Sequence, residues 1–138
     1  MSSTLTAEAT DVALRKGGCT CGSVRFRTQG NPKWVLWCHC ADCRRHSGAP
    51  ASAYASFSLD AIEMTKGEIT KFASSPPSLR GFCATCGSTL TAEVDYMPGE
   101  LHFHVGAFDA PETLPPQGEA FSNERLPWTP NTGLVSVR

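Results

Sequence analysis

The chain has 138 residues and a formal net charge of −1, and 41% of its residues are hydrophobic. This length suits one domain, the hydrophobic content suits a folded globular chain, and the near-neutral charge argues against a general nucleic-acid binder. No apolar run approaches the roughly 18 residues that a membrane-spanning helix requires. We therefore expect a folded domain with no membrane span and no nucleic-acid partner.

In chain order, residues 1–16 look like a tail or a loosely attached first strand. Alternating apolar and charged residues then predict a strand at 24–28, and short apolar segments predict strands at 34–37 and 49–57. Turn-forming residues further along the chain predict two hairpins. The hairpins pair residues 62–64 with 69–72 around Lys66-Gly67, and residues 89–94 with 101–105 across residues 97–99.

The last part of the chain is rich in proline and is expected to run over the surface, held by Phe121 and Trp128. No segment shows a sustained helical period, and no internal repeat occurs. We therefore predict one mainly β domain at residues 17–130, between an N-terminal tail at 1–16 and a C-terminal tail at 131–138.

The seven cysteines fall into three tight groups, which random scatter would not produce. The first residues of the chain lack the basic and apolar segments of a signal peptide, so a cytoplasmic location is expected. A reducing compartment disfavours disulfides, and an odd number of cysteines cannot pair completely. Clustered cysteines in that setting are more often metal ligands or catalytic groups.

Zinc takes four thiolate or imidazole ligands in a structural site, and three plus an open position in a catalytic site. The seven cysteines divide naturally into four and three. Two of them, Cys21 and Cys86, are each followed by glycine, which can turn with positive φ and direct amide groups at the sulfurs. We therefore expect a structural zinc in the four-cysteine cluster, which comprises Cys19, Cys21, Cys83 and Cys86. The alternative is that these cysteines are reduced, metal-free thiols.

The three-cysteine cluster comprises Cys38, Cys40 and Cys43, which lie within six residues of one another. No fourth cysteine remains for it, so a second zinc there would take water, a substrate thiol or His46 as its fourth ligand. With His46, the site would be a closed Cys3His site. His39 stands between two of the cysteines and is expected to point away from the metal.

Basic residues crowd this region: residues 15–45 carry seven bases and one acid. Arg44, Arg45 and His46 are expected to contact the substrate. The two arginines could hold a carboxylate of a glutathione-like substrate, or they could offset the charge of the zinc thiolates. His102 and His104 lie two apart in a predicted strand and share one face. One of them could serve as a general base, but a solvated polar face is the simpler interpretation.

Three motifs, in order, resemble those of the glutathione-dependent formaldehyde-activating enzyme family, also called the centromere protein V family. They are GCTCGSVRF at 18–26, CHCADCRRHSGA at 38–49 and FCATCGS at 82–88. Residues 125–128 resemble the closing Arg- and Trp-containing segment of that family. The resemblance spans roughly residues 17–128.

This resemblance implies a β-tent fold, with two antiparallel sheets related to the Mss4-like scaffold. It implies a structural zinc in the four-cysteine cluster and an open, catalytic zinc in the three-cysteine cluster. The implied activity is the addition of the glutathione thiol to formaldehyde, classed as a carbon–sulfur lyase. The chain departs from the family at His46, where small residues are usual, and at residues 107–109 and 119–121. These departures leave the substrate open.

Two further functions remain open at this point. The chain could be a non-catalytic zinc-binding module whose second zinc is closed and inert. It could also be a thiol–disulfide oxidoreductase that uses Cys83 and Cys86. The last interpretation leaves five cysteines unexplained, and no predicted helix starts after the motif.

Overall fold

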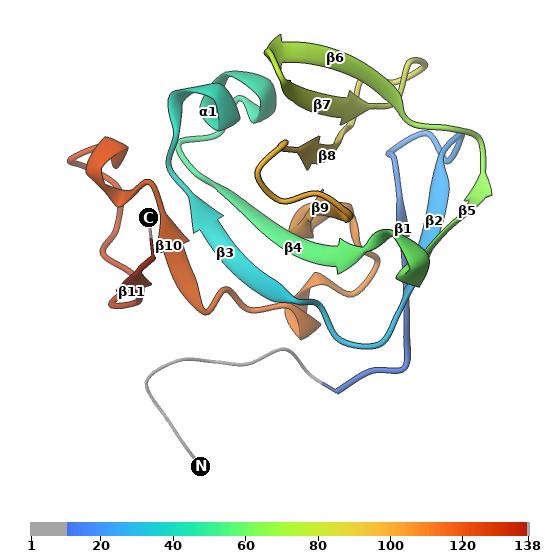
Figure 1. The fold of residues 1–138 in the computed structure, drawn as a ribbon, viewed down its shortest axis with the longest axis horizontal. Helices are drawn as coiled ribbons and strands as arrows, with labels where there is room; N and C mark the ends of the chain where they lie inside the picture. The colour runs from blue at the N-terminus through green and yellow to red at the C-terminus, as the bar shows by residue number, and fades with distance from the viewer. Residues whose placement is uncertain (1–10, 138) are drawn as a thin grey trace.

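The computed structural model describes residues 11–137, so residues 1–10 of the predicted tail lie outside the described part. Two β-sheets and one α-helix form this part of the chain (Figure 1). The strands are β1 (Leu14–Gly18), β2 (Arg25–Gln29), β3 (Trp34–Cys38), β4 (Ser52–Ser58), β5 (Ile62–Lys66), β6 (Thr70–Ser75), β7 (Ser78–Phe82), β8 (Thr89–Glu93), β9 (Glu100–His104), β10 (Gly118–Ala120) and β11 (Val135–Ser136). The α-helix is α1 (Ala41–Ser47), and four short 3-10 helices are η1 (Leu59–Ala61), η2 (Val105–Ala107), η3 (Pro111–Thr113) and η4 (Ser122–Glu124).

The small sheet has the strand order β1-β2-β5, and both pairings are antiparallel. The large sheet has the order β11-β10-β3-β4-β9-β8-β7-β6. Its pairings from β3 to β6 are antiparallel, whereas β10 runs parallel to both β3 and β11. The prediction of a mainly β, two-sheet fold is confirmed, with these parallel pairings at one edge as an addition.

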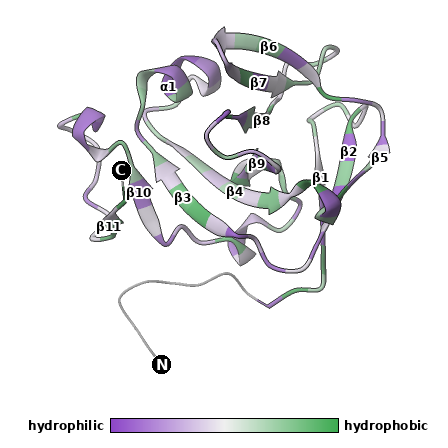
Figure 2. Ribbon diagram, viewed as in Figure 1, coloured by the Kyte–Doolittle hydropathy of each residue, from purple (hydrophilic) through white to green (hydrophobic). Residues whose placement is uncertain are grey.

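The hydrophobic core lies between the two sheets. Phe26 from β2 is 1% exposed and stacks on Phe103 from β9, with 4.1 Å between the ring centroids. Phe108 packs edge-on against Phe26 at 5.2 Å. Aromatic pairs of this kind add roughly 0.5–1.5 kcal/mol beyond the burial of their area. In Figure 2 the most hydrophobic colours on the large sheet lie on β3, while α1 is largely hydrophilic.

The two faces of the large sheet carry different residues, because alternate residues of each strand point to opposite faces. Val35, Ala55 and Phe103 form one row across β3, β4 and β9 and belong to the core. Neighbouring positions such as Leu36 and Tyr54 are paired on the opposite, outer face. The outer face carries the three-cysteine cluster and the cavity described below.

The helix α1 was missed by the search for a helical period, because seven residues span only two turns. Cys40 caps its N-terminus, and the Cys40 sulfur accepts the backbone N–H of Cys43 at 3.3 Å. The helix ends at Gly48, which has φ 75° and donates its N–H to the Arg44 carbonyl. Asp42 in the first turn also complements the helix dipole. Local capping therefore defines this helix.

One predicted hairpin is confirmed and the other is wrong. β8 pairs with β9 as expected. β5 pairs with β2 in the small sheet, and β6 pairs with β7 in the large sheet, so the turn at Gly67 passes the chain from one sheet to the other. Gly67 has φ 65°, and a Cβ there would lie 2.2 Å from the Ser23 carbonyl oxygen. The glycine thus marks a close approach between backbones instead of a hairpin turn.

Both ends of the described chain contribute short strands. β1 begins at Leu14, so the end of the segment at 1–16 is part of a strand, which is one of the two interpretations that the sequence offered for it, and β11 lies within residues 131–138. Trp128 is 68% exposed, so it does not hold the proline-rich segment, whereas Phe121 is half-buried on the outer face of the large sheet.

No helix within residues 11–137 is long and apolar enough to span a membrane.

Candidate metal centres

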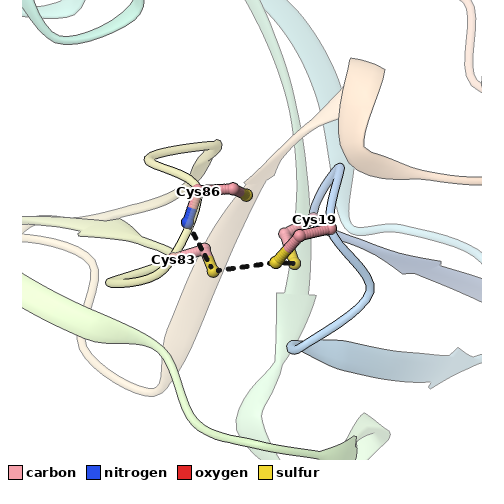
Figure 3. Close-up of side chains that lie close together, drawn as sticks. Cys19, Cys83 and Cys86 are labelled. Carbon is pink, nitrogen blue, oxygen red and sulfur yellow. Dashed lines mark hydrogen bonds between the residues drawn. The ribbon is translucent and has the colours of Figure 1, made fainter.

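The four-cysteine cluster joins two loops that are far apart in the sequence. Cys19 and Cys21 lie between β1 and β2, and Cys83 and Cys86 lie between β7 and β8. Figure 3 shows Cys83 and Cys86 facing Cys19 across a short gap. The sulfurs of Cys19 and Cys21 are 3.6 Å apart, and those of Cys21 and Cys83 are 3.8 Å apart. A tetrahedral zinc with Zn–S bonds of about 2.3 Å places its sulfurs about 3.8 Å apart. The spacing therefore fits a zinc ion.

Two matched turns shape this cluster. Gly22 has φ 82° and Gly87 has φ 80°, and their N–H groups donate to the carbonyls of Cys19 and Cys83. The turns aim backbone N–H groups at sulfur: Val24 donates to Cys19 Sγ at 3.3 Å. A hydrogen bond with the Ser88 hydroxyl lowers the pKa of Cys86 to about 5. These features favour thiolates, the form in which cysteine binds metals.

The three-cysteine cluster is built from one short stretch of chain. Cys38 ends β3, Cys40 caps α1, and Cys43 lies in the first turn of α1. The three sulfur–sulfur distances are 3.5, 3.1 and 2.9 Å. The neighbouring thiols of Cys38 and Cys43 lower the pKa of Cys40, while hydrogen bonds to Cys40 and Cys43, together with burial, raise the pKa of Cys38. Three sulfurs thus converge on one point, and a small outward movement of each would match the spacing around a tetrahedral zinc.

A cavity of about 260 Å³ opens directly onto the three-cysteine cluster. All three cysteines contribute to its wall. The other lining residues come from the outer face of the large sheet, from α1 and from the loop after β8. They are Trp34, Leu36, Asp42, Tyr54, Ser75, Ser78, Arg80, Ala92, Val94, Tyr96, Met97, His102, Ala120 and Phe121. The three-cysteine cluster therefore faces a space that a small molecule could enter.

Arg80 on β7 is the charged residue that contacts this cluster, and the sequence analysis did not identify it. Its Nη1 donates to Cys43 Sγ at 3.5 Å and to the Tyr54 hydroxyl at 3.0 Å. Its Nη2 and Nε donate to Asp42 Oδ2 at 2.6 and 3.0 Å. Arg80 is 5% exposed. Burial alone would lower its pKa, but Tyr54, Cys43 and Asp42 outweigh that effect and raise the pKa.

The charge of Arg80 matters because thiolates in a low-dielectric site need compensation. Asp42 binds the guanidinium of Arg80 from the other side, so that this group has a fixed orientation toward Cys43. The only sequence signal was a charged residue in an otherwise apolar segment, three residues before Cys83. Without knowledge of which strands pair, this signal cannot be distinguished from that of a charged residue at an exposed strand position.

The residues predicted to bind substrate lie elsewhere. Arg44 donates to the carbonyls of His39 and Glu124, and Arg45 is exposed. His46 is half-buried, and its ring centroid lies 5.6 Å from that of His104. None of the three predicted residues lines the cavity at the cysteines. Their role in substrate binding stays a prediction.

His46 is also absent from the group of ligand atoms that converge at the three-cysteine cluster. Among the described residues, that group holds the three cysteines alone, so the geometry gives no closed Cys3His site. His39 is 1% exposed, and its Nε2 lies 2.6 Å from Glu119 Oε1. Its ring therefore engages the neighbouring strand β10 instead of the cysteines, as the sequence analysis expected.

His102 and His104 are buried, so the predicted solvated face is wrong. They lie on the outer face of the large sheet, which other side chains cover. His102 lines the cavity and packs edge-on against Trp34 at 4.6 Å. His104 packs on Tyr54 at 4.4 Å. Burial, with smaller effects of His46 and Arg80, lowers the pKa of His104 to about 3, so its ring is neutral at pH 7.

Comparison with known proteins points to one protein family. Residues 14–124 match the family model described as glutathione-dependent formaldehyde-activating enzyme. Over 112 residues the chain is 30% identical to a Halomonas elongata protein named as a candidate enzyme of that kind, covering 75% of this chain and 71% of the relative. Over 75 residues it is 28% identical to a Schizosaccharomyces pombe protein named as an uncharacterized lyase, covering 54% of each.

A solved structure supports the fold alone. The crystal structure of a Rhodobacter sphaeroides protein superposes with a TM-score of 0.53 at 22% identity, covering 68% of this chain and 87% of that one. The family match spans both cysteine clusters and most of the two sheets. The chain therefore belongs to the glutathione-dependent formaldehyde-activating enzyme family.

Proposed function

We propose that the protein is a zinc-dependent carbon–sulfur lyase that joins a thiol to an aldehyde, and separates them again, at the three-cysteine cluster. The observation that carries this proposal is the cavity wall: three sulfurs converge at its surface with no fourth protein ligand among the described residues. Catalytic zinc sites keep such an open position, whereas structural sites are closed. The four-cysteine cluster has the full ligand set of a structural site.

Both clusters suit zinc on the chemistry of their donors, because soft thiolates favour zinc over magnesium or calcium. Cys19, Cys21, Cys83 and Cys86 would hold one ion, and Cys38, Cys40 and Cys43 would hold the second, giving two zinc ions per chain. A zinc bound by three thiolates is a weak Lewis acid with an affinity for soft sulfur, so it supplies a position that favours a thiolate over hydroxide. Thiol chemistry therefore fits this donor set better than hydrolysis.

The reaction is an addition that balances without an oxidant or a reductant. The sulfur forms a bond to the carbonyl carbon, the C=O double bond becomes a single bond, and the thiol proton ends on the oxygen. The reverse reaction breaks the C–S bond and returns the thiol and the aldehyde. The family name and the name of the Halomonas elongata relative suggest glutathione as the thiol and formaldehyde as the aldehyde.

The residues of this chain would contribute position and charge. Cys38, Cys40 and Cys43 would hold the zinc ion at the wall of the cavity. Arg80 compensates the thiolate charge through its hydrogen bond to Cys43. Trp34 and Phe121 would exclude water from the space above the cysteines, which strengthens these electrostatic contacts.

Zinc analysis and exchange NMR test this proposal together. We expect two zinc ions per chain, and faster exchange between formaldehyde and S-hydroxymethylglutathione in the presence of the protein than in buffer. Cys40→Ser should abolish the acceleration, while Leu59→Ser, at a residue that is 55% exposed and outside the cavity, should retain it. Two tightly held zinc ions with no acceleration for any thiol tested would instead support the alternative, a non-catalytic zinc-binding module.

A further inference from the structure

The wall of the cavity above the three cysteines is apolar and aromatic. Trp34 and Leu36 project from β3, and the loop after β8 supplies three more side chains. Phe121 closes the wall from the end of β10, where it packs against the buried cluster that contains Cys38 and Cys43. The apolar lining residues are Trp34, Leu36, Ala92, Val94, Tyr96, Met97, Ala120 and Phe121. A ligand whose sulfur reaches the cysteines must bring its adjoining atoms against this surface.

The charged groups of the wall are already paired. Asp42 and Arg80 line the cavity and form an ion pair of 2.6 Å with each other. His102, the histidine of the wall, has its Nε2 3.4 Å from Glu100 Oε1. Arg80 also donates to Tyr54 and Cys43. The basic groups of the wall already lie against carboxylates of the protein, so a carboxylate of a ligand would be buried without a partner, which is strongly unfavourable.

Phe121 holds its place at a conformational cost. Its φ is 54°, and among the described residues it is the only one other than glycine with positive φ. A bulky residue rarely adopts this conformation, and such outliers persist where the surroundings require them. The unusual backbone keeps Phe121 at the wall, beside the sulfurs of the three-cysteine cluster.

The size of the cavity also favours a small, uncharged ligand. Its volume of about 260 Å³ is smaller than the roughly 300–1,000 Å³ of sites that enclose drug-sized ligands. A tripeptide with two carboxylates would extend into solvent and would leave the apolar wall only partly covered. A compact hydrophobic body would fill the same space and displace water from it.

We propose that the substrate of the three-cysteine site has an uncharged, apolar body next to its sulfur, and that Phe121 is the specificity-determining residue that selects it. The inference rests on the proposed function, because it assumes that a thiol binds at this site. The substrate class is then a hydrophobic thiol, or its aldehyde adduct. Glutathione is a poorer ligand of this cavity.

Cobalt-loaded full-length protein allows a direct test, because the visible absorption of cobalt bound to thiolates changes when a further sulfur binds. Phenylmethanethiol and 4-(mercaptomethyl)benzoate form a matched pair, alike in thiol and ring and different in one carboxylate. We expect phenylmethanethiol to bind at least 10-fold more tightly than the benzoate, and more tightly than glutathione. In Phe121→Asn, which keeps a residue that tolerates positive φ, the preference should fall several-fold.

Two further variants complete the design. Phe72→Asn, at a residue that is 61% exposed on β6 and outside the cavity, should keep the wild-type preference. Met97→Arg places a cation in the wall and should improve binding of the benzoate. Equal binding of the matched pair, or tighter binding of glutathione, would overturn the inference while leaving the proposed function intact. A cobalt spectrum that no thiol changes would overturn the proposed function, and the inference with it.

Discussion

Arg80 and Cys43, which are 37 residues apart in the sequence, are joined by a hydrogen bond from Nη1 to Sγ at 3.5 Å. The contact places a buried positive charge beside one of the three sulfurs in the wall of the cavity. Asp42 and Tyr54 fix the guanidinium from its other sides. The electrostatics of the three-cysteine cluster therefore depend on a strand outside the cysteine motifs.

Replacing Arg80 should weaken metal binding at the three-cysteine cluster and leave the four-cysteine cluster loaded. Residues that orient metal ligands typically contribute 10–100-fold in affinity. We expect Arg80→Met to lower the zinc affinity of one site per chain by that factor, measured by competition with a chelator. Arg27→Met is the matched control, because Arg27 forms an exposed ion pair with Glu63. A loss at both sites, or in both variants, would contradict the assignment.

The two cysteine clusters should differ in their effect on stability. Structural zinc sites contribute roughly 10–16 kcal/mol of apparent binding energy to small domains, so Cys83→Ser should lower stability by several kcal/mol. Cys40→Ser should alter the melting temperature far less, because serine also serves as a helix N-cap. Calorimetry of both variants, each with its zinc content measured, tests the difference. Equal losses of stability would show that both zinc ions are structural.

His104 should make stability depend on pH. Its folded pKa of about 3 lies below the ordinary value of 6.5, so the unfolded chain binds a proton more readily than the folded chain. The stabilisation from the neutral ring is complete above about pH 6.5 and declines as pH falls from there toward 3. Acid also protonates the cysteines, so the difference between wild type and His104→Gln is the quantity to measure. The stability of the variant should fall less steeply between pH 6.5 and 5 in denaturant titrations.

The contact between the sheets should be sensitive to Phe26. The ring is buried between Phe103 and Phe108, and Phe→Ala substitutions at such positions cost about 3–5 kcal/mol. Phe26→Ala should therefore unfold at markedly lower urea concentration than wild type. Phe72→Ala, at an exposed position, should unfold close to wild type. Similar shifts for both variants would mean that Phe26 does not anchor the core.

Much of the fold could be predicted because most strands here show a local pattern. The strand around Phe26 alternates with period two, and the hairpin of β8 and β9 surrounds a short turn. The passage of the chain from one sheet to the other at Gly67 could not be predicted. A sharp turn has the same sequence signal whether the next strand folds back on the last one or enters another sheet. The helix at Ala41–Ser47 was hidden because its signals are caps, and the cap residue is itself a cysteine.

The grouping of the cysteines could be predicted because spacing and trailing glycines are local features. The structure brings the sulfurs together in the expected groups of four and three. Arg80, Phe121 and His102 could not be recognised in advance as cavity residues, because each reaches the site through strand pairing across the large sheet. Arg44 and Arg45 were favoured because they are near the cysteines in sequence, and the helix turns them toward other partners or solvent.

The unequal spacing of the two clusters affects the order in which a newly made chain can acquire metal. Cys38 and Cys43 leave the ribosome almost together, whereas Cys21 must wait for Cys83, 62 residues later. At roughly 5–20 residues per second, several seconds of synthesis separate these events. Under the proposed assignment of zinc to both clusters, the ligands of the three-cysteine cluster are therefore complete first in an unfinished chain. An ion that joins the two loops of the four-cysteine cluster could be bound only when most of the protein has been translated.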